Sequence, residues 1–216
     1  MNLVIFGPPG AGKGTQSNFI VEKYKLHQIS TGQLLRNEIK NKSKLGIEIS
    51  TIINSGNLVS DQIVSNLILK FISNNKFKNR LIFDGYPRNI YQAENLNSLL
   101  KKNNQKIDLA LKISVPLNII KKRISGRSIC SICGKIYNEF FNPAPNKSNC
   151  CAPKFLQKRA DDTLEVAISR YQMYEENIKP VINFYENSNL LKVVDGQGSI
   201  SEINNKISDL IDTIKG

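Results

Sequence analysis

The sequence has very little histidine and no long apolar run. Its only histidine, His27, lies beside an apparent strand end, so we expect a structural role for it and no catalysis by histidine. No stretch reaches the roughly 18 apolar residues of a membrane-spanning helix. Met1 leads directly into a strand, with no room for a signal peptide. We therefore expect a cytoplasmic protein with no membrane partner.

Internal repeats, low-complexity tracts and long linkers are also missing. The chain has 216 residues, of which 40% are hydrophobic and 22% charged, as in an ordinary soluble globular protein. A chain of this length buries a sizeable core as one main domain and leaves room for small insertions.

Acidic residues are scarce: 18 of them stand against 30 lysines and arginines, and the net charge is +12. Such an excess suits an acidic partner, either nucleotide phosphates or a nucleic acid. Compositional drift is the alternative for most lysines, because Lys, Asn and Ile are abundant throughout the chain. No basic run is interleaved with aromatic residues, so we expect no nucleic-acid partner.

The stretch FGPPGAGKGT at residues 6–15 is typical of a phosphate-binding loop. The apolar run before it predicts a buried strand, and apolar residues at helical spacing after it predict a helix. Glycines let backbone N–H groups approach phosphate oxygens, the helix N-terminus attracts the same anions, and Lys13 adds a charge for the outer phosphates. Gly14 stands where the general pattern has Ser or Thr, and Thr15 comes one residue later.

Strands and helices alternate along the chain, which predicts an α/β fold with a parallel sheet covered on both faces. The expected strands cover residues 3–6, 81–84, 109–115 and 190–194. A long helix is expected at 162–187, where Pro180 could interrupt it, and Ser199 with Glu202 forms a capping box that opens the last helix. In such sheets, ligands bind at the carboxyl ends of the strands. The loops at 7–15, 84–88 and 195–198 should therefore meet in one site.

Asp84 follows three apolar residues at the end of a predicted strand, as the acid of a Walker-B strand does. A carboxylate there would orient Mg²⁺ through water, because this ion keeps much of its hydration shell. Capping of the next helix is the alternative role for Asp84.

Together with the phosphate loop, three further motifs resemble the adenylate kinase family: LIFDGYPR-x-x-x-Q at 81–92, STG-x-x-x-R at 30–36 and ISGR at 124–127. The likeness extends from Met1 to the final helix. It implies a P-loop three-layer sandwich with a central parallel sheet and two insertions. The implied division is a P-loop core at 1–29, 60–125 and 161–216, an AMP-binding helical segment at 30–59, and a lid at 126–160.

The resemblance also implies the reaction and its participants. Members of the family transfer a phosphoryl group reversibly from Mg-ATP to AMP, giving two ADP. ATP, AMP and ADP would be the partners, Mg²⁺ the cofactor, and a monomer the acting form. The AMP phosphate attacks directly, and a lid, for which this family is a standard example, keeps water away from the site.

The family's ATP-binding positions fall on the phosphate loop, the entrance to the lid, the lid itself and the region before the last helix. They are Gly10, Ala11, Gly12, Lys13, Gly14, Thr15, Arg123, Arg127, Ile136, Tyr137 and Gly198. By this resemblance Arg123 would lie against the ATP base and Arg127 against its phosphates. The carbonyl group of Gly198 would meet the base.

The family's AMP-binding positions are Thr31, Arg36, Asn57, Leu58, Val59, Gly85, Tyr86, Pro87, Arg88, Gln92, Arg159 and Arg170. Thr31 and Gln92 would hydrogen-bond the adenine base, since an amide matches a base edge. Arg36 and Arg88 would hold the phosphate, because guanidinium binds phosphate bidentately. Asn57 stands where the family often has lysine.

The residues implied as catalytic surround the transferred group and are Lys13, Arg88, Arg127, Arg159 and Arg170. Their role would be to compensate the charge of the transferred phosphoryl group. For any one of these arginines, a solvated salt bridge is the alternative. Their joint occurrence at motif spacing favours the catalytic interpretation.

The four cysteines, Cys130, Cys133, Cys150 and Cys151, lie in one short segment, and a cytosolic context favours metal over disulfides. The first two form half of a zinc knuckle, and Cys150 stands at the third ligand position of the family's zinc-bearing lids. Pro153 stands at the fourth position. Cys151 directly follows Cys150, about 3.8 Å away between Cα atoms, and would reach the same ion only with an unusual backbone. Structural zinc and four free thiols in a packed lid remain the two interpretations.

Two other functions compete with phosphoryl transfer from ATP to AMP. The first is a related kinase acting on UMP or CMP, or using GTP to phosphorylate AMP; Thr31 and Gln92 favour AMP as the acceptor. The second is a zinc-containing nucleic-acid-binding protein, suggested by the basic charge and the cysteines. Retention on DNA that weakens steeply with salt would indicate this second class.

Overall fold

The computed structural model describes residues 1–54, 59–145, 150–158 and 162–215. Its centre is a five-stranded sheet in the order β2-β3-β1-β4-β8, with every pair of neighbours parallel. The strands are β1 (Leu3–Phe6), β2 (His27–Ser30), β3 (Leu81–Asp84), β4 (Leu109–Ser114) and β8 (Leu191–Asp195). The predicted α/β fold with a parallel sheet is thus confirmed.

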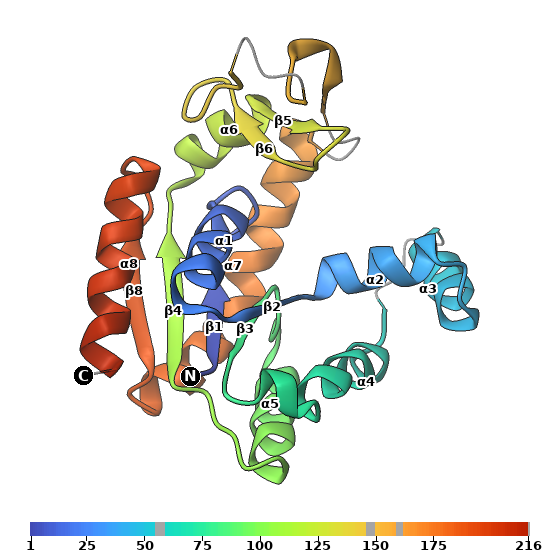
Figure 1. The fold of residues 1–216 in the computed structure, drawn as a ribbon, viewed down its shortest axis with the longest axis vertical. Helices are drawn as coiled ribbons and strands as arrows, with labels where there is room; N and C mark the ends of the chain where they lie inside the picture. Colours follow the sequence, from blue (N-terminus) through green and yellow to red (C-terminus); the bar gives the residue numbers. More distant parts are fainter. Residues whose placement is uncertain (55–58, 146–149, 159–161, 216) are drawn as a thin grey trace.

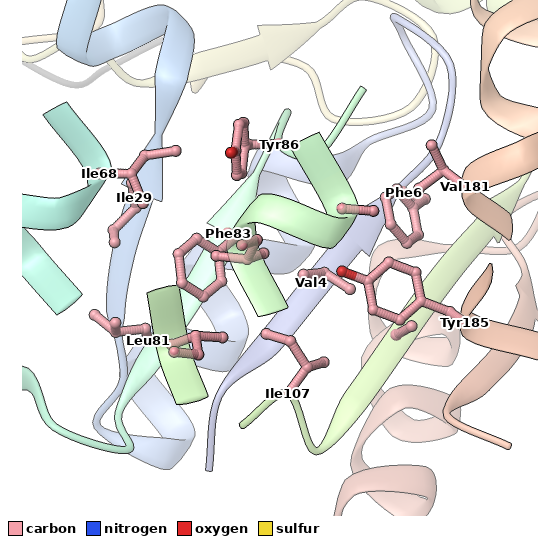
Figure 2. Close-up of a cluster of buried hydrophobic side chains, with 14 of the residues drawn as sticks. Val4, Phe6, Ile29, Ile68, Leu81, Phe83, Tyr86, Ile107, Val181 and Tyr185 are labelled. Atoms are coloured by element: carbon pink, nitrogen blue, oxygen red, sulfur yellow. The ribbon is translucent and has the colours of Figure 1, made fainter. Parts of the chain in front are cut away.

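Helices cover both faces of this sheet (Figure 1). On one face lie α4 (Asp61–Ile72), α5 (Ile90–Lys102) and most of α7 (Leu164–Asn187); on the other lie α1 (Lys13–Tyr24), α6 (Leu117–Ser125) and α8 (Ile200–Lys215). Side chains alternate along a strand, so Val4 and Phe6 enter the first core while Leu3 and Ile5 enter the second. Figure 2 shows Val4, Phe6 and Phe83 packed in the first core with Tyr185 of α7.

Two groups of elements extend away from the sheet (Figure 1). Helices α2 (Thr31–Lys40) and α3 (Lys44–Asn54) project sideways after β2. At the end of the molecule near α6 lies a small antiparallel sheet in the order β6-β5-β7, formed by β5 (Arg127–Cys130), β6 (Ile136–Asn138) and β7 (Leu156–Gln157). Two short 3₁₀ helices, η1 (Asn75–Phe77) and η2 (Pro153–Phe155), complete the described elements.

Helix α7 differs from its prediction in two respects. It begins at Leu164, two residues later than predicted, because Thr163 caps it by accepting a hydrogen bond from the backbone N–H of Val166 at 3.3 Å. It also runs through Pro180 as one helix. A proline inside a helix removes one backbone hydrogen bond. Here Val181 and Ile182 are buried against the sheet, and this packing favours an uninterrupted helix.

In the described part of the chain, no helix is both long and apolar enough to cross a membrane.

The predicted capping box is present at the start of α8, where Glu202 accepts from the backbone N–H of Ser199 at 2.7 Å and donates its own N–H to the Ser199 hydroxyl at 3.3 Å.

The central sheet gives a direct test of the core. Phe83 of β3 has no exposed surface. Replacing it with alanine should lower the free energy of unfolding by about 3–5 kcal/mol, through lost burial and a cavity. Denaturant unfolding measures this change. The exposed Val193 of β8, 57% accessible, provides the control, and Val193→Ala should stay within about 0.5 kcal/mol of the parent. Equal effects of the two substitutions would contradict this packing.

Candidate active site

The phosphate loop joins β1 to α1 and turns back on itself. The backbone N–H of Ala11 donates to the Pro8 carbonyl oxygen at 3.0 Å. Gly12 precedes α1 in the left-handed region at φ 94°, a conformation that glycine adopts without steric cost. A Cβ at Gly10 would lie 3.1 Å from the side chain of Ile124, so the loop packs closely on α6. The loop therefore has the close backbone turn that phosphate recognition requires.

Lys13, the first residue of α1, directs its ammonium group back into this loop. Its Nζ donates to the carbonyl oxygens of Gly7 at 2.6 Å and Pro8 at 3.2 Å. Burial lowers the pKa of Lys13 to about 8; Asp84 opposes this shift, whereas Arg88 and Arg127 add to it. The ammonium thus lies within electrostatic reach of three charged side chains from other segments. A phosphate group beside it would restore the charged form.

Asp84 ends β3 at the carboxyl edge of the sheet, where it pairs in register with Ser30 of β2. Its Oδ2 accepts a hydrogen bond from Nε2 of Gln28 at 3.0 Å. Oδ1 has no hydrogen-bond partner among the described residues. A carboxylate held by one oxygen and open at the other fits a hydrated magnesium ion, which prefers oxygen ligands and retains water.

The carbonyl oxygen of Gly85 joins two of the predicted AMP residues. It accepts from Oγ1 of Thr31 at 3.0 Å and from Nε of Arg88 at 2.8 Å. Arg88 reaches the surface, yet desolvation by the surrounding chain lowers its pKa; Asp84 opposes this shift and Arg170 adds to it. Arg88, in the loop after β3, and Arg170 of α7 thus place positive charge in one region. This region suits a group with several negative charges.

Gln92 lies in the first turn of α5 with 6% of its surface exposed. Its Oε1 accepts the backbone N–H of Arg88 at 2.7 Å. Its Nε2 donates to Oδ1 of Asp61, and Oδ2 of Asp61 accepts from Nδ2 of Asn89 at 3.1 Å. Sequence reasoning missed Asp61, which reads only as the acid that opens α4, because its partners lie about 30 residues further along the chain.

Arg123 of α6 connects three segments. Its Nη1 donates to the Ala11 carbonyl at 2.9 Å and its Nη2 to the Gly196 carbonyl at 2.6 Å. Its guanidinium carbon lies 5.3 Å from the centre of the Phe141 ring, within cation–π range. Arg123, which the sequence predicts to lie against the ATP base, thus connects the phosphate loop, the loop after β8 and the segment that follows β6. Sequence reasoning did not identify Phe141.

Arg127 of β5 forms an ion pair with Asp162, to which both Nε and Nη2 donate. Only 1% of the Asp162 side chain is exposed. In this conformation Arg127 is therefore held in a largely buried salt bridge, which differs from the solvated one considered from the sequence. The pair connects the start of the small sheet to the chain before α7.

The remaining predicted positions are distributed as follows. Arg36 is exposed and donates to Oε1 of Gln33 on its own helix at 3.1 Å. Val59 is half-buried against the first core, Tyr86 and Pro87 are buried, and Gly14 and Thr15 lie in the first turn of α1. Ile136 is 41% exposed, whereas Tyr137 is buried with Cys130 and Cys151. Gly198 lies beside Glu202. Asn57, Leu58 and Arg159 lie outside the described residues.

The four cysteines form one cluster, with all four Sγ atoms within 4.8 Å of one another. The Cys130 and Cys150 sulfurs are 3.9 Å apart, and those of Cys133 and Cys151 are 3.5 Å apart. Neighbouring sulfurs in a tetrahedral zinc–thiolate site lie roughly 3.8 Å apart. Cys150 and Cys151 both direct their sulfurs into this cluster, from the turn before η2. A cysteine cluster that could hold a metal is therefore present.

The thiols of this cluster influence one another strongly. A hydrogen bond with Cys133 is the largest of the causes that raise the pKa of Cys150 to about 12; desolvation and the other two cysteines follow. Thiolates this close repel one another. A bound cation would remove that repulsion, since metal binding and thiol deprotonation are coupled.

A glycine-rich loop before a helix, an acid at the end of the neighbouring strand and converging arginines define a P-loop protein that binds nucleotide phosphates. The chain belongs to the adenylate kinase family, whose model matches residues 5–190. Similar proteins include an adenylate kinase of Pelagibacter ubique, 46% identical over 211 residues that cover 98% of this chain and 99% of the relative. Adenylate kinases of Thermococcus kodakarensis, 42% identical over 99% of this chain and 95% of the relative, and of Thermodesulfovibrio yellowstonii, 40% identical over 98% and 99%, are also similar.

The lowered pKa of Lys13 predicts that ATP binding takes up a proton near pH 8. The charged form binds phosphate, so affinity should fall by up to about tenfold per pH unit as the pH rises above 8, until the pKa of the bound state is reached. Titration calorimetry in buffers of different ionisation enthalpy measures the uptake. Lys13→Arg stays charged and should bind with little pH dependence. The same pH dependence in Lys13→Arg would exclude Lys13 as the titrating group.

Proposed function

We propose that this protein transfers the terminal phosphoryl group of ATP to AMP, reversibly, giving two ADP. The observation that carries the proposal is the convergence of Lys13, Asp84 and Arg88 beside the phosphate loop, at the carboxyl edge of the sheet. Membership in the adenylate kinase family supports it. The charge at this edge matches the phosphates that two nucleotides would place opposite each other.

The reaction needs no protein nucleophile. An oxygen of the AMP phosphate attacks the terminal phosphorus of ATP, and the bond from that phosphorus to the bridging oxygen breaks, leaving ADP. The protein aligns the two nucleotides and compensates charge on the transferred group. The resemblance assigns this role to Lys13, Arg88, Arg127, Arg159 and Arg170. The electrostatic proximity of Lys13 to Arg88, and of Arg88 to Arg170, supports the assignment. One such arginine is worth roughly 10³–10⁵ in rate.

Asp84 would hold magnesium through water, and Gln28 keeps the carboxylate in place. Bound magnesium neutralises part of the phosphate charge. The protein's own contribution is to keep Asp84 within electrostatic reach of Lys13, so that a magnesium ion held there and the ammonium group would serve the same phosphates.

The segments of the chain would have the same functions as in the family. Residues 1–29, 60–125 and 161–216 form the P-loop core, 30–59 bind AMP and 126–160 form a lid that closes over ATP. The projecting positions of α2, α3 and the small sheet support this division (Figure 1). We also propose that the protein acts as a cytoplasmic monomer, with AMP as the acceptor rather than UMP or CMP.

The cysteine cluster would hold structural zinc. Four sulfurs within 4.8 Å supply a complete tetrahedral shell, with Cys151 rather than residue 153 as the fourth ligand. Of the cluster, Cys130 and Cys151 pack with Tyr137 in a small apolar core, so the ion and this core would together stabilise the lid.

A coupled assay of ADP formation tests the proposed reaction. AMP should be phosphorylated faster than UMP or CMP, with ATP preferred over GTP as the donor. Lys13→Ala should lower turnover by at least about a thousandfold, because it removes the positive charge that stabilises the outer phosphates. The packing of the hydrophobic core does not involve this side chain, so the fold should persist. Circular dichroism and thermal unfolding show that the variant is folded. Near-normal ADP production by folded Lys13→Ala, or faster reaction with UMP or CMP, would reject the proposal.

Elemental analysis with thiol titration tests the zinc site. About one zinc per chain is expected, and chelation should destabilise residues 126–160 first and weaken ATP affinity more than AMP affinity. Cys151→Ser should lower zinc affinity as much as Cys130→Ser, because both sulfurs belong to one cluster. Four titratable thiols, no metal and an unchanged thermal transition in chelator would show that the cluster is a set of free thiols.

A further inference from the structure

The side-chain amide of Gln92 is held at both ends by partners of fixed polarity. The backbone N–H of Arg88 can only donate, so it requires the oxygen Oε1, at 2.7 Å. The carboxylate of Asp61 can only accept, so it requires the nitrogen Nε2. These two contacts determine which end of the amide is the oxygen and which is the nitrogen.

Two hydrogen-bonding positions of the amide remain for a ligand. One lone pair of Oε1 and one N–H of Nε2 have no partner among the described residues. They are an acceptor and a donor of one amide, and the two protein partners determine which end of the amide carries each. Because only 6% of Gln92 is exposed, rotation of the amide by 180° would bring its oxygen against the Asp61 carboxylate within a confined site.

Purine bases differ in the order of the matching groups. Adenine presents an amino donor beside a ring-nitrogen acceptor, whereas hypoxanthine presents a carbonyl acceptor beside an N–H donor. An amide free to rotate matches either edge, but an amide held in one orientation matches only one. A site whose buried polar groups lack partners rejects the wrong base strongly.

We propose that Asp61 is a specificity-determining positioning residue: by accepting from Nε2, it holds the Gln92 amide in the orientation that suits adenine and excludes 6-oxopurines. This inference rests on the proposed function in taking Gln92 as the residue that meets the acceptor base. Asp61 acts through Gln92 and itself touches no reacting atom. Its charge makes it the stronger of the two constraints, since hydrogen bonds to ionised groups are about twice as strong as neutral ones.

Asp61 also makes contacts that stabilise the fold and are independent of base recognition. It accepts from Asn89 and lies in the first turn of α4, where a carboxylate stabilises the helix N-terminus. Loss of these contacts would lower stability and activity toward every acceptor alike. Only the control of the Gln92 amide predicts a change in the preference between two bases.

The test compares AMP with inosine monophosphate, which differs from AMP in the groups at positions 1 and 6 of the base. In Asp61→Asn the new amide offers either an oxygen or an N–H, so the Gln92 amide can rotate. The ratio of kcat/KM for inosine monophosphate to kcat/KM for AMP should rise about tenfold. The KM for ATP should stay unchanged. The Arg88 N–H remains, so the preference should weaken rather than invert.

Ser60→Ala is the matched control. Ser60 is the adjacent residue and caps α4 by accepting from the backbone N–H of Ile63, but no hydrogen bond joins the described side chains of Ser60 and Gln92. This variant should lose thermal stability and keep the parent's ratio. Asp61→Ser, whose hydroxyl can accept or donate and suits a first helical turn, replaces Asp61→Asn if the latter does not fold.

The outcomes separate this inference from the proposed function. If the parent protein fails to phosphorylate AMP, the proposed function is wrong. If the parent phosphorylates AMP and the ratio is unchanged in the Asp61 variants, or rises equally in Ser60→Ala, the role assigned to Asp61 is wrong. A rise confined to the Asp61 variants supports it.

Discussion

Parallel pairing of β1 with its neighbours β3 and β4 is the constraint on which the site depends. It brings the carboxyl ends of these strands to one edge, so the phosphate loop, Asp84 and the segment after β4 emerge together. Both faces of the sheet are covered, and the four apolar side chains of β1 point alternately into the two cores. Polar and charged groups are therefore concentrated at this edge, where the backbone leaves the sheet.

The same edge gathers positive charge that the protein only partly compensates. Burial and the two neighbouring arginines lower the pKa of Lys13, and Asp84 offsets only some of this effect. Arg127 is instead neutralised by Asp162, which lies just before α7. Phosphate groups would supply the missing negative charge. The uncompensated positive charge of the site is therefore what favours nucleotide binding. Arg127 would have to leave Asp162, at least in part, to reach a phosphate.

The small antiparallel sheet is stabilised differently from the central one. Its core contains only a few side chains, among them Tyr137, Cys130 and Cys151, because so short a segment cannot bury much apolar surface. A cysteine cluster at its centre suits such a segment, since metal binding adds stability where packing is small. Contacts at its base, from Phe141 to Arg123 and from Arg127 to Asp162, connect it to the core beside the proposed ATP site.

The sequence by itself determined the class of fold and the chemistry of single residues. Apolar periodicity predicted the sheet and its helices, and the glycine spacing with Lys13 predicted a phosphate loop, because these patterns act over a few residues. The tertiary structure decided which residues share a contact: Asp61 with Gln92, Arg127 with Asp162, and Cys151 with the other cysteines. These partners are separated by 18 or more residues, except for adjacent Cys150 and Cys151, and no local pattern relates them. The continuity of α7 through Pro180 has the same origin, because burial against the sheet, and not helix propensity, outweighs the lost hydrogen bond.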